Sequence, residues 1–447
     1  MEKVNARKIA LKILSDIEEN GAYSNIAINK TLKTKDISTL DRRFISQLVY
    51  GVLENKLYLD FIIKNFSKTK IKKIHVDILN ILRLGLYQII YLDKVPNSAA
   101  VNESVKLAKK VNFRLAGYVN GILRNYLRNS NSLKLPNFKE KPIEFLSLKY
   151  SHPMWIIENW IDNFGIEFTE KLLKANNDVP NLTIRTNKLK ITRDELLNVL
   201  AEENVKCIKG QYVDESIIIK NFNTSIESLN SFKEGLFQVQ DEASMLAGLI
   251  LNPKENDFVI DVCSAPGGKS THIAELMQNR GKVLSRDIHE HKLILINQNA
   301  KRLGISIIET EIYDALKLDK SLIGKADKVL VDAPCSGFGI IRRKPEIKYL
   351  KNLEDIKKLS EIQYKILLNA SQYVKKEGFL VYCTCTIQPD ENIEVINRFL
   401  KDNNSFVMDN VNKYLPNSLQ TDKNYLQLFP HLHGVDGFFI CKLKRIK

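Results

Sequence analysis

The chain has 447 residues, of which 44% are hydrophobic and 27% charged, and its formal net charge is +15. This length exceeds what one hydrophobic core usually supports, so we expect two or three domains. No apolar run approaches the roughly 18 residues that span a bilayer, and six scattered cysteines do not form a disulfide framework, so we expect a cytoplasmic protein outside the membrane.

The positive charge is concentrated in the first third of the chain. Residues 1–140 carry 25 Lys and Arg against 12 Asp and Glu, whereas the remaining residues carry 42 against 40. Such asymmetry suits a surface that binds a polyanion such as RNA. A solvated helical surface in a lysine-rich proteome accounts for the composition equally well.

Residues 1–130 are predicted to form an all-helical domain. Apolar residues recur at helical spacing in the first two segments, and Asp41 is the expected N-cap of the second. Residues 76–92 are apolar nearly all round, as in the central helix of a bundle. A later predicted helix has a face that combines basic and aromatic side chains, namely Arg114, Tyr118, Arg124, Tyr126 and Arg128.

A polar linker at 131–142 is expected to lead into a small α/β subdomain at 143–236. One helix is predicted near 154–175 and another at 192–203. Three short strands are expected around the second helix, in the segments 181–187, 206–210 and 216–220.

Residues 237–447 alternate between strands and helices, which is typical of a parallel, doubly wound, Rossmann-like sheet. The predicted strands are 258–263, 282–287, 305–309, 327–332 and 378–383. The predicted helices are 269–278, 289–303 and 354–375, and residues 436–445 are expected to form a final strand.

The first strand of this region leads through a glycine turn into a helix. Gly267 and Gly268 let the backbone approach a ligand closely. The turn matches neither G-x-G-x-x-G nor the spacing of a phosphate-binding loop, which disfavours a dinucleotide or a nucleoside triphosphate.

Aspartates follow three successive strands. Asp287 is placed to accept hydrogen bonds from ribose hydroxyls, Asp314 from an adenine amino group, and Asp332 lies at the end of the fourth strand. Together they suit a ligand with a ribose, an adenine amine and a positive centre, which describes S-adenosylmethionine. The alternative is that each aspartate only caps a helix or a turn.

Two cysteines lie at neighbouring strand ends. Cys335 follows Asp-Ala-Pro after the fourth strand, and Cys385 ends the fifth. A thiolate is a strong nucleophile that can add to carbon 6 of a pyrimidine and so activate carbon 5 toward a methyl sulfonium. On this reasoning alone the two cysteines are interchangeable. Cys383 and Cys263 are expected to lie within strands and to pack there or face away.

The motifs DVCSAPGGKSTH, DAPCSGFGIIRRKPEI and YCTCTIQPDEN resemble those of the RsmB/NOP family of RNA cytosine-C5 methyltransferases. The segments DRRFISQLVYGVLEN and RLAGYVNGILRNYLR resemble the helical NusB-like domain of its bacterial members, which methylate small-subunit ribosomal RNA. The resemblance covers essentially the whole chain and implies a NusB-like RNA-binding domain followed by a methyltransferase domain.

Carried over to this sequence, the resemblance makes Cys385 the nucleophile and gives Cys335 a role in releasing the methylated product. It implies that S-adenosylmethionine binds to Cys263, Ser264, Ala265, Pro266, Gly267, Gly268, Lys269, Asp287, Asp314 and Asp332. Thr386 replaces a commoner serine, a hydroxyl-for-hydroxyl change. Cys383 is unusual, and alternation places it on the same side of the strand as Cys385, which leaves open a rescuing role or an inhibitory disulfide.

Arg342, Arg343 and Lys344 follow the Pro-Cys motif and suit contacts to phosphates beside the target base, although a solvated charge run is the alternative. The expected activity is methylation of carbon 5 of a cytosine in 16S rRNA by a monomeric, metal-free enzyme. Two alternatives stay open, namely the same chemistry on tRNA and a non-catalytic NusB-like assembly factor that binds RNA.

Overall fold

The computed structural model describes residues 5–33, 37–221 and 225–447. The chain divides into two compact units. The helical unit comprises the described residues up to Asp178 together with Ile341–Leu350, and the sheet unit comprises Val179–Ile340 and Lys351–Lys447. The chain therefore leaves the sheet unit for ten residues, enters the helical unit and returns.

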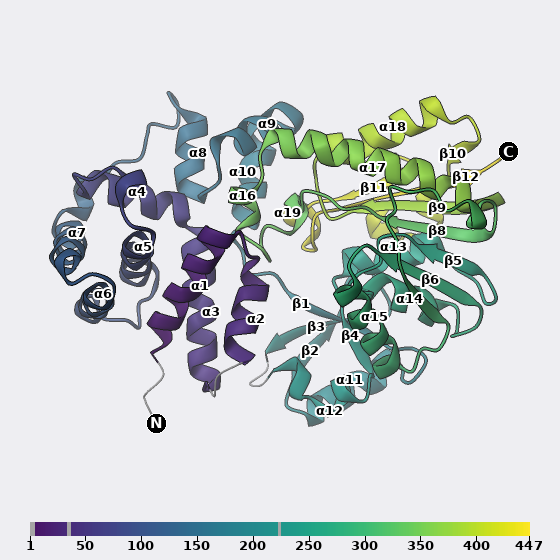
Figure 1. Ribbon diagram of the computed structural model, residues 1–447, viewed down its shortest axis with the longest axis horizontal. Coiled ribbons are helices and arrows are strands. Elements are labelled where there is room, and N and C mark those ends of the chain that lie inside the picture. Colours follow the sequence, from purple (N-terminus) through teal and green to yellow (C-terminus); the bar gives the residue numbers. More distant parts are fainter. Residues whose placement is uncertain (1–4, 34–36, 222–224) are drawn as a thin grey trace. The chain divides into compact units, whose positions relative to one another are not determined.

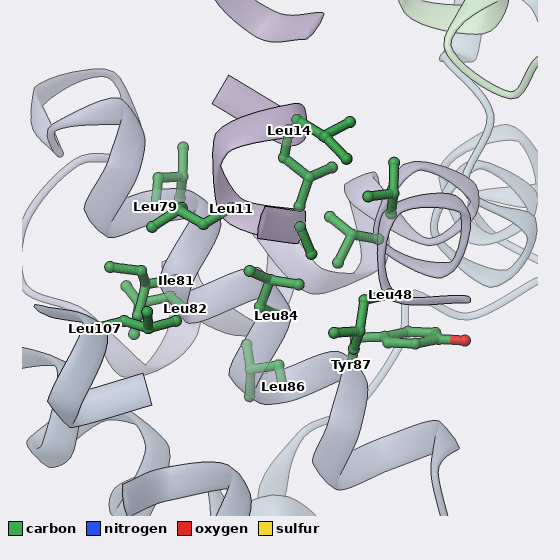
Figure 2. Packing of buried hydrophobic residues seen from close by; sticks show 14 of the residues in the cluster. Leu11, Leu14, Leu48, Leu79, Ile81, Leu82, Leu84, Leu86, Tyr87 and Leu107 are labelled. Atoms are coloured by element: carbon green, nitrogen blue, oxygen red, sulfur yellow. The ribbon is translucent and has the colours of Figure 1, made fainter. Parts of the chain in front are cut away.

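The helical unit is built around a central helix, α5 (Val76–Tyr91), in which every residue from Ile78 to Gln88 is buried. Figure 2 shows side chains of α1, α3 and α6 gathered around α5, with Leu82, Leu84 and Tyr87 of α5 among them. The prediction of a helix that is apolar nearly all round is confirmed. The other helices of the bundle are α1 (Ala6–Asn20), α2 (Ser24–Lys33), α3 (Thr39–Glu54), α4 (Lys56–Phe66), α6 (Asn97–Val111) and α7 (Ala116–Asn129).

Two local predictions in the helical unit were wrong. The N-cap of α3 is Ser38, whose hydroxyl accepts a hydrogen bond from the Asp41 backbone N–H, and Asp41 lies within the first turn. The expected helix near 154–175 is divided at Gly165 into α9 (Met154–Phe164) and α10 (Ile166–Ala175), because Gly165 has a φ of +82°, outside the helical region.

Residues expected at the start of the α/β subdomain belong to the helical unit. Helix α8 (Pro142–Tyr150) packs against α4, and α9 and α10 pack against α8. The segment Ile341–Leu350 also lies in this unit and ends in the short helix α16 (Ile347–Leu350). Lys348 of α16 is fully buried and donates to the Glu54 carbonyl over 3.2 Å, and burial lowers its pKa to about 7.

The sheet unit contains two sheets (Figure 1). The smaller is antiparallel in the order β2-β3-β1-β4 and carries helix α11 (Arg193–Glu202), so the predicted small α/β subdomain is confirmed. Its strands are β1 (Leu182–Thr186), β2 (Lys206–Lys209), β3 (Ser216–Asn221) and β4 (Phe237–Val239).

The larger sheet has the order β10-β12-β9-β8-β5-β6-β7, and β11 pairs with β12. Helices α13 (Glu242–Leu251), α14 (Gly268–Leu276) and α15 (Glu290–Leu303) cover one face (Figure 1). Helices α17 (Leu353–Tyr373) and α18 (Ile393–Asp402) cover the other. The strands are β5 (Phe258–Asp261), β6 (Lys282–Asp287), β7 (Ile308–Ile312), β8 (Ala326–Asp332), β9 (Val374–Thr384), β10 (Phe406–Met408), β11 (Tyr425–Leu428) and β12 (Phe438–Arg445).

This sheet is mixed, not wholly parallel as predicted. Strands β5 to β9 are parallel to one another, whereas β12 runs antiparallel to β9 and pairs with β10 and β11. The third predicted strand lies three residues too early, because the Ile305 N–H donates to the Ala300 carbonyl in the turn that follows α15. The first ends at Asp261, so Cys263 lies in the following loop.

No helix among the described segments combines the length and the apolar character needed to cross a membrane. Within the same segments there is no cluster of three or more His, Cys, Asp or Glu side chains placed to hold a metal ion.

Candidate active site

The two candidate thiols lie at the carboxyl ends of two adjacent parallel strands. In the register of β8 and β9, Asp332 is paired with Cys383, so the loops after both strands leave the sheet at the same edge. Cys335 lies in the loop after β8 and Cys385 directly after β9. Their Sγ atoms are 3.3 Å apart, and both side chains are partly exposed. The structure thus brings together the two residues that the sequence had placed at separate strand ends.

Backbone hydrogen bonds hold the loop that carries Cys335 against the loop that carries Cys385. The Ala333 N–H donates to the Cys383 carbonyl, and the Gly339 N–H donates to the Cys385 carbonyl, each over 3.0 Å. A side chain at Gly339 would lie 1.8 Å from the Gly437 carbonyl oxygen, so only glycine allows this approach. The spacing of the two thiols is therefore fixed on both sides of Cys335.

The thiol of Cys335 is a weaker acid than an ordinary cysteine. The hydrogen bond with Cys385, together with burial, raises the pKa of Cys335 well above its usual range. Cys335 therefore carries an S–H at neutral pH that can donate to the sulfur of Cys385. Such a donor would stabilise negative charge on Cys385.

Cys383 does not belong to this pair. It is buried, and its Sγ lies 3.5 Å from Asp332 Oδ1. Burial and the nearby Asp332 carboxylate raise the pKa of Cys383 well above its usual range, so it remains a thiol. All six cysteines are free.

Lys269 and Asp332 form an ion pair between the glycine turn and the thiols. Lys269 Nζ donates to Asp332 Oδ2 over 2.6 Å. Burial by itself would lower the pKa of Lys269, but the Asp332 carboxylate raises it above its usual range, so the ammonium is charged. Both side chains were predicted to bind the cofactor, and they lie where the glycine turn meets the end of β8.

The glycine turn between β5 and α14 has the geometry expected of a close backbone approach. Gly267 has a φ of +95°, and a Cβ there would lie 3.0 Å from Ile296. Gly268 faces open space, since a Cβ there would meet only Gln240, at 4.0 Å. The turn is closed by the Gly267 N–H donating to the Ser264 carbonyl over 2.8 Å, and Ser264 donates to the carbonyl of Arg286 on β6.

The remaining predicted carboxylates lie at the same edge of the sheet. Asp287 ends β6 and accepts from the His289 N–H, and Asp314 follows β7 and accepts from the Leu316 N–H, each over 3.0 Å. In both aspartates, Oδ1 thus accepts a backbone hydrogen bond within a turn, which is the alternative role given above for these residues. The open backbone at Gly268 and the carboxylates after successive strands fit the nucleoside and the positive centre of S-adenosylmethionine.

Two residues that the sequence analysis had not assigned form hydrogen bonds to the glycine turn and the first turn of α14. Asp261 ends β5, is fully buried and accepts from Ser270 Oγ over 2.6 Å, and burial raises its pKa to about 7. Arg185 of the small sheet donates to the Gly268 carbonyl over 2.9 Å and forms a buried ion pair with Glu275 of α14. Asp261 follows the same pattern of an aspartate at a strand end, whereas no sequence signal marks Arg185.

The three residues predicted to contact RNA belong to the helical unit, whereas the thiols and the glycine turn belong to the sheet unit. Arg342, Arg343 and Lys344 belong to the ten-residue segment in the helical unit. Arg342 is 9% exposed, whereas Arg343 and Lys344 are partly exposed, and Lys344 Nζ lies 5.0 Å from the centre of the Tyr23 ring. Arg343 and Lys344 are thus the more accessible of the three.

Known proteins match the chain along its whole length. Three family models match, namely the 16S rRNA methyltransferase RsmB/F at 248–444, the NusB family at 4–128 and a ferredoxin-like domain of RsmF/B-like methyltransferases at 152–226. The chain is 41% identical to the probable ribosomal RNA small subunit methyltransferase B of Bacillus subtilis (strain 168), with 100% of both proteins covered. It is 31% identical to the ribosomal RNA small subunit methyltransferase B of Proteus mirabilis (strain HI4320), with 99% of both covered.

Solved structures share the fold of the chain. The crystal structure of PH0851 superposes with a TM-score of 0.84 at 28% identity and covers 99% of both chains. NSun6 from Pyrococcus horikoshii, solved with SFG, has a TM-score of 0.60 at 24% identity and covers 66% of this chain and 98% of its own. The predicted fold class, a NusB-like helical domain, a small α/β subdomain and a methyltransferase domain, is confirmed.

Proposed function

The chain belongs to the RsmB/F family of rRNA methyltransferases and uses S-adenosylmethionine, and from this premise we propose that it methylates carbon 5 of a cytosine in 16S rRNA through a covalent bond to Cys385. The observation that carries the proposal is the 3.3 Å separation of the Cys335 and Cys385 sulfur atoms at the edge of the sheet. Membership in an enzyme family argues against the alternative of a non-catalytic assembly factor.

Two thiols suit this reaction because carbon 5 of cytosine is a poor nucleophile. The Cys385 thiolate adds to carbon 6 and forms an S–C bond, and carbon 5 then has enamine character. S-adenosylmethionine supplies an electrophilic methyl group when it is bound. Once carbon 5 carries the methyl group, its remaining proton must leave, the double bond re-forms and the S–C bond breaks to restore the Cys385 thiolate.

Cys335 is assigned to the release step. After its own proton has passed to solvent, the Cys335 thiolate accepts the proton from carbon 5, and the electron pair of the C–H bond restores the ring double bond. The hydrogen bond with Cys385 is the first cause of the raised pKa of Cys335, and it is lost once Cys385 is bonded to carbon 6, so Cys335 then gives up its proton more readily. The same raised pKa keeps Cys335 protonated, and therefore a hydrogen-bond donor to Cys385, while Cys385 is the attacking group.

The cofactor is assigned to the glycine turn and the strand-end carboxylates. Residues 263–269 would supply the open backbone, Asp287 and Asp314 would accept hydrogen bonds from the nucleoside, and Asp332 would bind on the side of the positive centre. The Lys269 ammonium neutralises Asp332 and fixes the direction of its carboxylate. Asp332 thus separates the region assigned to the cofactor from the region assigned to the cytosine.

The RNA is assigned to the basic helical domain. Exposed arginines of α7 and the accessible Arg343 and Lys344 contact phosphates, a type of contact that gives affinity and register without reading bases. Because a stacked cytosine shields carbon 5 and carbon 6, the target is an unstacked base in a loop or a bulge. The enzyme acts as a monomer in the cytoplasm.

The proposal is tested with two cysteine variants and one control. Cys385→Ala should abolish methyl transfer, whereas Cys335→Ala should accumulate a protein–RNA adduct that survives denaturing electrophoresis. Cys207→Ala, in β2 of the small sheet, should behave as the wild type. Methylation by Cys385→Ala would refute the assignment of the nucleophile. Bisulfite sequencing of 16S rRNA and tRNA from cells with and without the gene identifies the substrate, and a change confined to tRNA would refute the choice of 16S rRNA.

A further inference from the structure

The buried carboxylate of Glu391 accepts hydrogen bonds from the loop that carries Cys335. It ends a short turn after β9 and its side chain is fully buried. The carboxylate accepts from the Ser336 N–H over 2.8 Å, from the Ser336 hydroxyl over 2.5 Å and from Gln363 Nε2 over 3.0 Å. Gln363 also donates to the Pro334 carbonyl over 2.9 Å. The residues on both sides of Cys335 are thus held through Glu391 and Gln363.

The next residue, Asn392, holds the loop that carries Cys385 in the same way. The Thr384 hydroxyl donates to Asn392 Oδ1 over 2.5 Å, and Asn392 Nδ2 donates to the Thr386 carbonyl over 3.1 Å. Asn392 is 1% exposed. Its amide therefore bonds to the residues immediately before and after Cys385.

A direct bond joins the two halves of this network. The hydroxyls of Ser336 and Thr386 lie 2.8 Å apart, so the residue after Cys335 contacts the residue after Cys385. The two loops belong to different strands, and the dipeptide Glu391–Asn392 is the point at which the bonds to both converge. The two sulfur atoms that lie 3.3 Å apart are carried by the loops that these bonds connect.

Burial of the Glu391 carboxylate is unfavourable in itself, so stability alone does not explain this network. Burial raises the pKa of Glu391, and the hydrogen bonds from Ser336 and Gln363 oppose this rise only in part. Burying an ionised carboxylate carries a desolvation penalty that its hydrogen bonds must offset. Its benefit is geometric, because a hydrogen-bonded carboxylate fixes its donors to one position.

We propose that Glu391 and Asn392 are positioning residues that set the spacing and orientation of the two catalytic thiols, Glu391 through the Cys335 loop and Asn392 through the Cys385 loop. This inference rests on the proposed function for the roles of the thiols, but the spacing can be measured without RNA. Loss of the Glu391 bonds impairs product release more than addition, and loss of the Asn392 bonds impairs addition.

Oxidation by diamide tests whether the two thiols are held within reach of each other. Diamide takes up two hydrogen atoms as it converts two thiols to one disulfide, and is itself reduced to the hydrazine. The rate of the Cys335–Cys385 disulfide, followed by peptide mass spectrometry on the full chain without RNA, should fall by on the order of 10- to 100-fold in Glu391→Gln and in Asn392→Ala, because small misplacements of reacting groups slow their reaction by such factors.

The chain provides a matched control in Glu242. This buried carboxylate of α13 also accepts from backbone N–H groups, of Tyr212 and Val213, and from a serine hydroxyl, of Ser216, but none of its partners flanks a cysteine. Glu242→Gln should lower the melting temperature as Glu391→Gln does and leave the disulfide rate unchanged. Should Glu391→Gln fail to fold, Ser336→Ala removes one donor, keeps the backbone bond and should give a smaller reduction.

RNA separates this inference from the function on which it rests. With S-adenosylmethionine and a 16S rRNA fragment, Glu391→Gln should accumulate the denaturation-resistant adduct, and Asn392→Ala should form it more slowly than the wild type. Disulfide rates equal to the wild type in both variants would overturn the positioning role. Reduced disulfide rates with no adduct in any variant, Cys335→Ala included, would support the positioning role and refute the covalent mechanism.

Discussion

Replacing Asp261 with asparagine should flatten the pH dependence of the stability of the sheet unit. Asp261 is fully buried at the end of β5, and burial raises its pKa from 3.8 to about 7 against the hydrogen bond from Ser270. As the pH rises, the unfolded chain loses this proton near pH 4, whereas the folded unit keeps it until about pH 7. The stability that the protonated side chain provides is therefore fully present below pH 4 and is lost as the pH rises through 7.

The magnitude follows from the displacement of the pKa. Each unit corresponds to about 1.4 kcal/mol, so the loss is about 4 kcal/mol in total, and about 2 kcal/mol of it falls between pH 5 and pH 7. Asparagine has nearly the same shape and can still accept from Ser270, but it does not ionise. The free energy of unfolding of Asp261→Asn should therefore decline less steeply over this range than that of the wild type.

The assay is urea unfolding at pH 5, 6 and 7, followed by two signals. Both tryptophans, Trp155 and Trp160, lie in the helical unit, so their fluorescence follows that unit, whereas far-UV circular dichroism follows both units. The variant should differ from the wild type in the dichroism transition assigned to the sheet unit. Equal pH slopes in that transition would show that Asp261 ionises normally and would refute the reasoning.

Further outcomes are expected from single changes elsewhere. Gly267→Ala should lower the stability of the sheet unit by about 1–2 kcal/mol, because the φ of +95° at this position disfavours a side chain. Gly268→Ala should alter the affinity for the cofactor, measured by calorimetry, and leave the melting temperature unchanged. Leu82→Ala should destabilise the helical unit by about 2–5 kcal/mol in tryptophan-monitored unfolding, since Leu82 is fully buried in α5. Arg128→Gln should reduce the slope of log affinity for RNA against log salt by about 1, measured by fluorescence anisotropy; an unchanged slope would exclude a phosphate contact.

Much of the fold was predictable because its periodicity is strong. The long apolar stretch of α5 and the strands β6 and β8 were placed within one residue of their observed ends. The short strands β10 and β11, of three and four residues, carry too little periodicity to be recognised, and their antiparallel pairing with β12 depends on contacts distant in sequence. The division of the helix near 154–175 depended on one glycine conformation, which a helical apolar pattern does not reveal.

The candidate site was predictable in its chemistry and less so in its support. Cysteines and aspartates at strand ends follow from chain order, since parallel strands deliver their carboxyl ends to one edge. The buried Glu391 and Arg185 were missed because each acts on residues remote in sequence, Glu391 on Ser336 and Arg185 on Gly268. Glu391 lay within a recognised motif, but nothing in the local sequence indicates what its carboxylate contacts.

The sequence by itself determined the reacting groups, the glycine turn and the family to which they belong, because these depend on residue type and on spacing along the chain. Only the tertiary structure decided that the sulfur atoms of Cys335 and Cys385 lie 3.3 Å apart, that Cys383 faces Asp332, and that Ile341–Leu350 belongs to the helical unit. The physical reason is that distances between side chains on separate strands are set by strand register and by buried hydrogen bonds, which connect residues fifty or more positions apart.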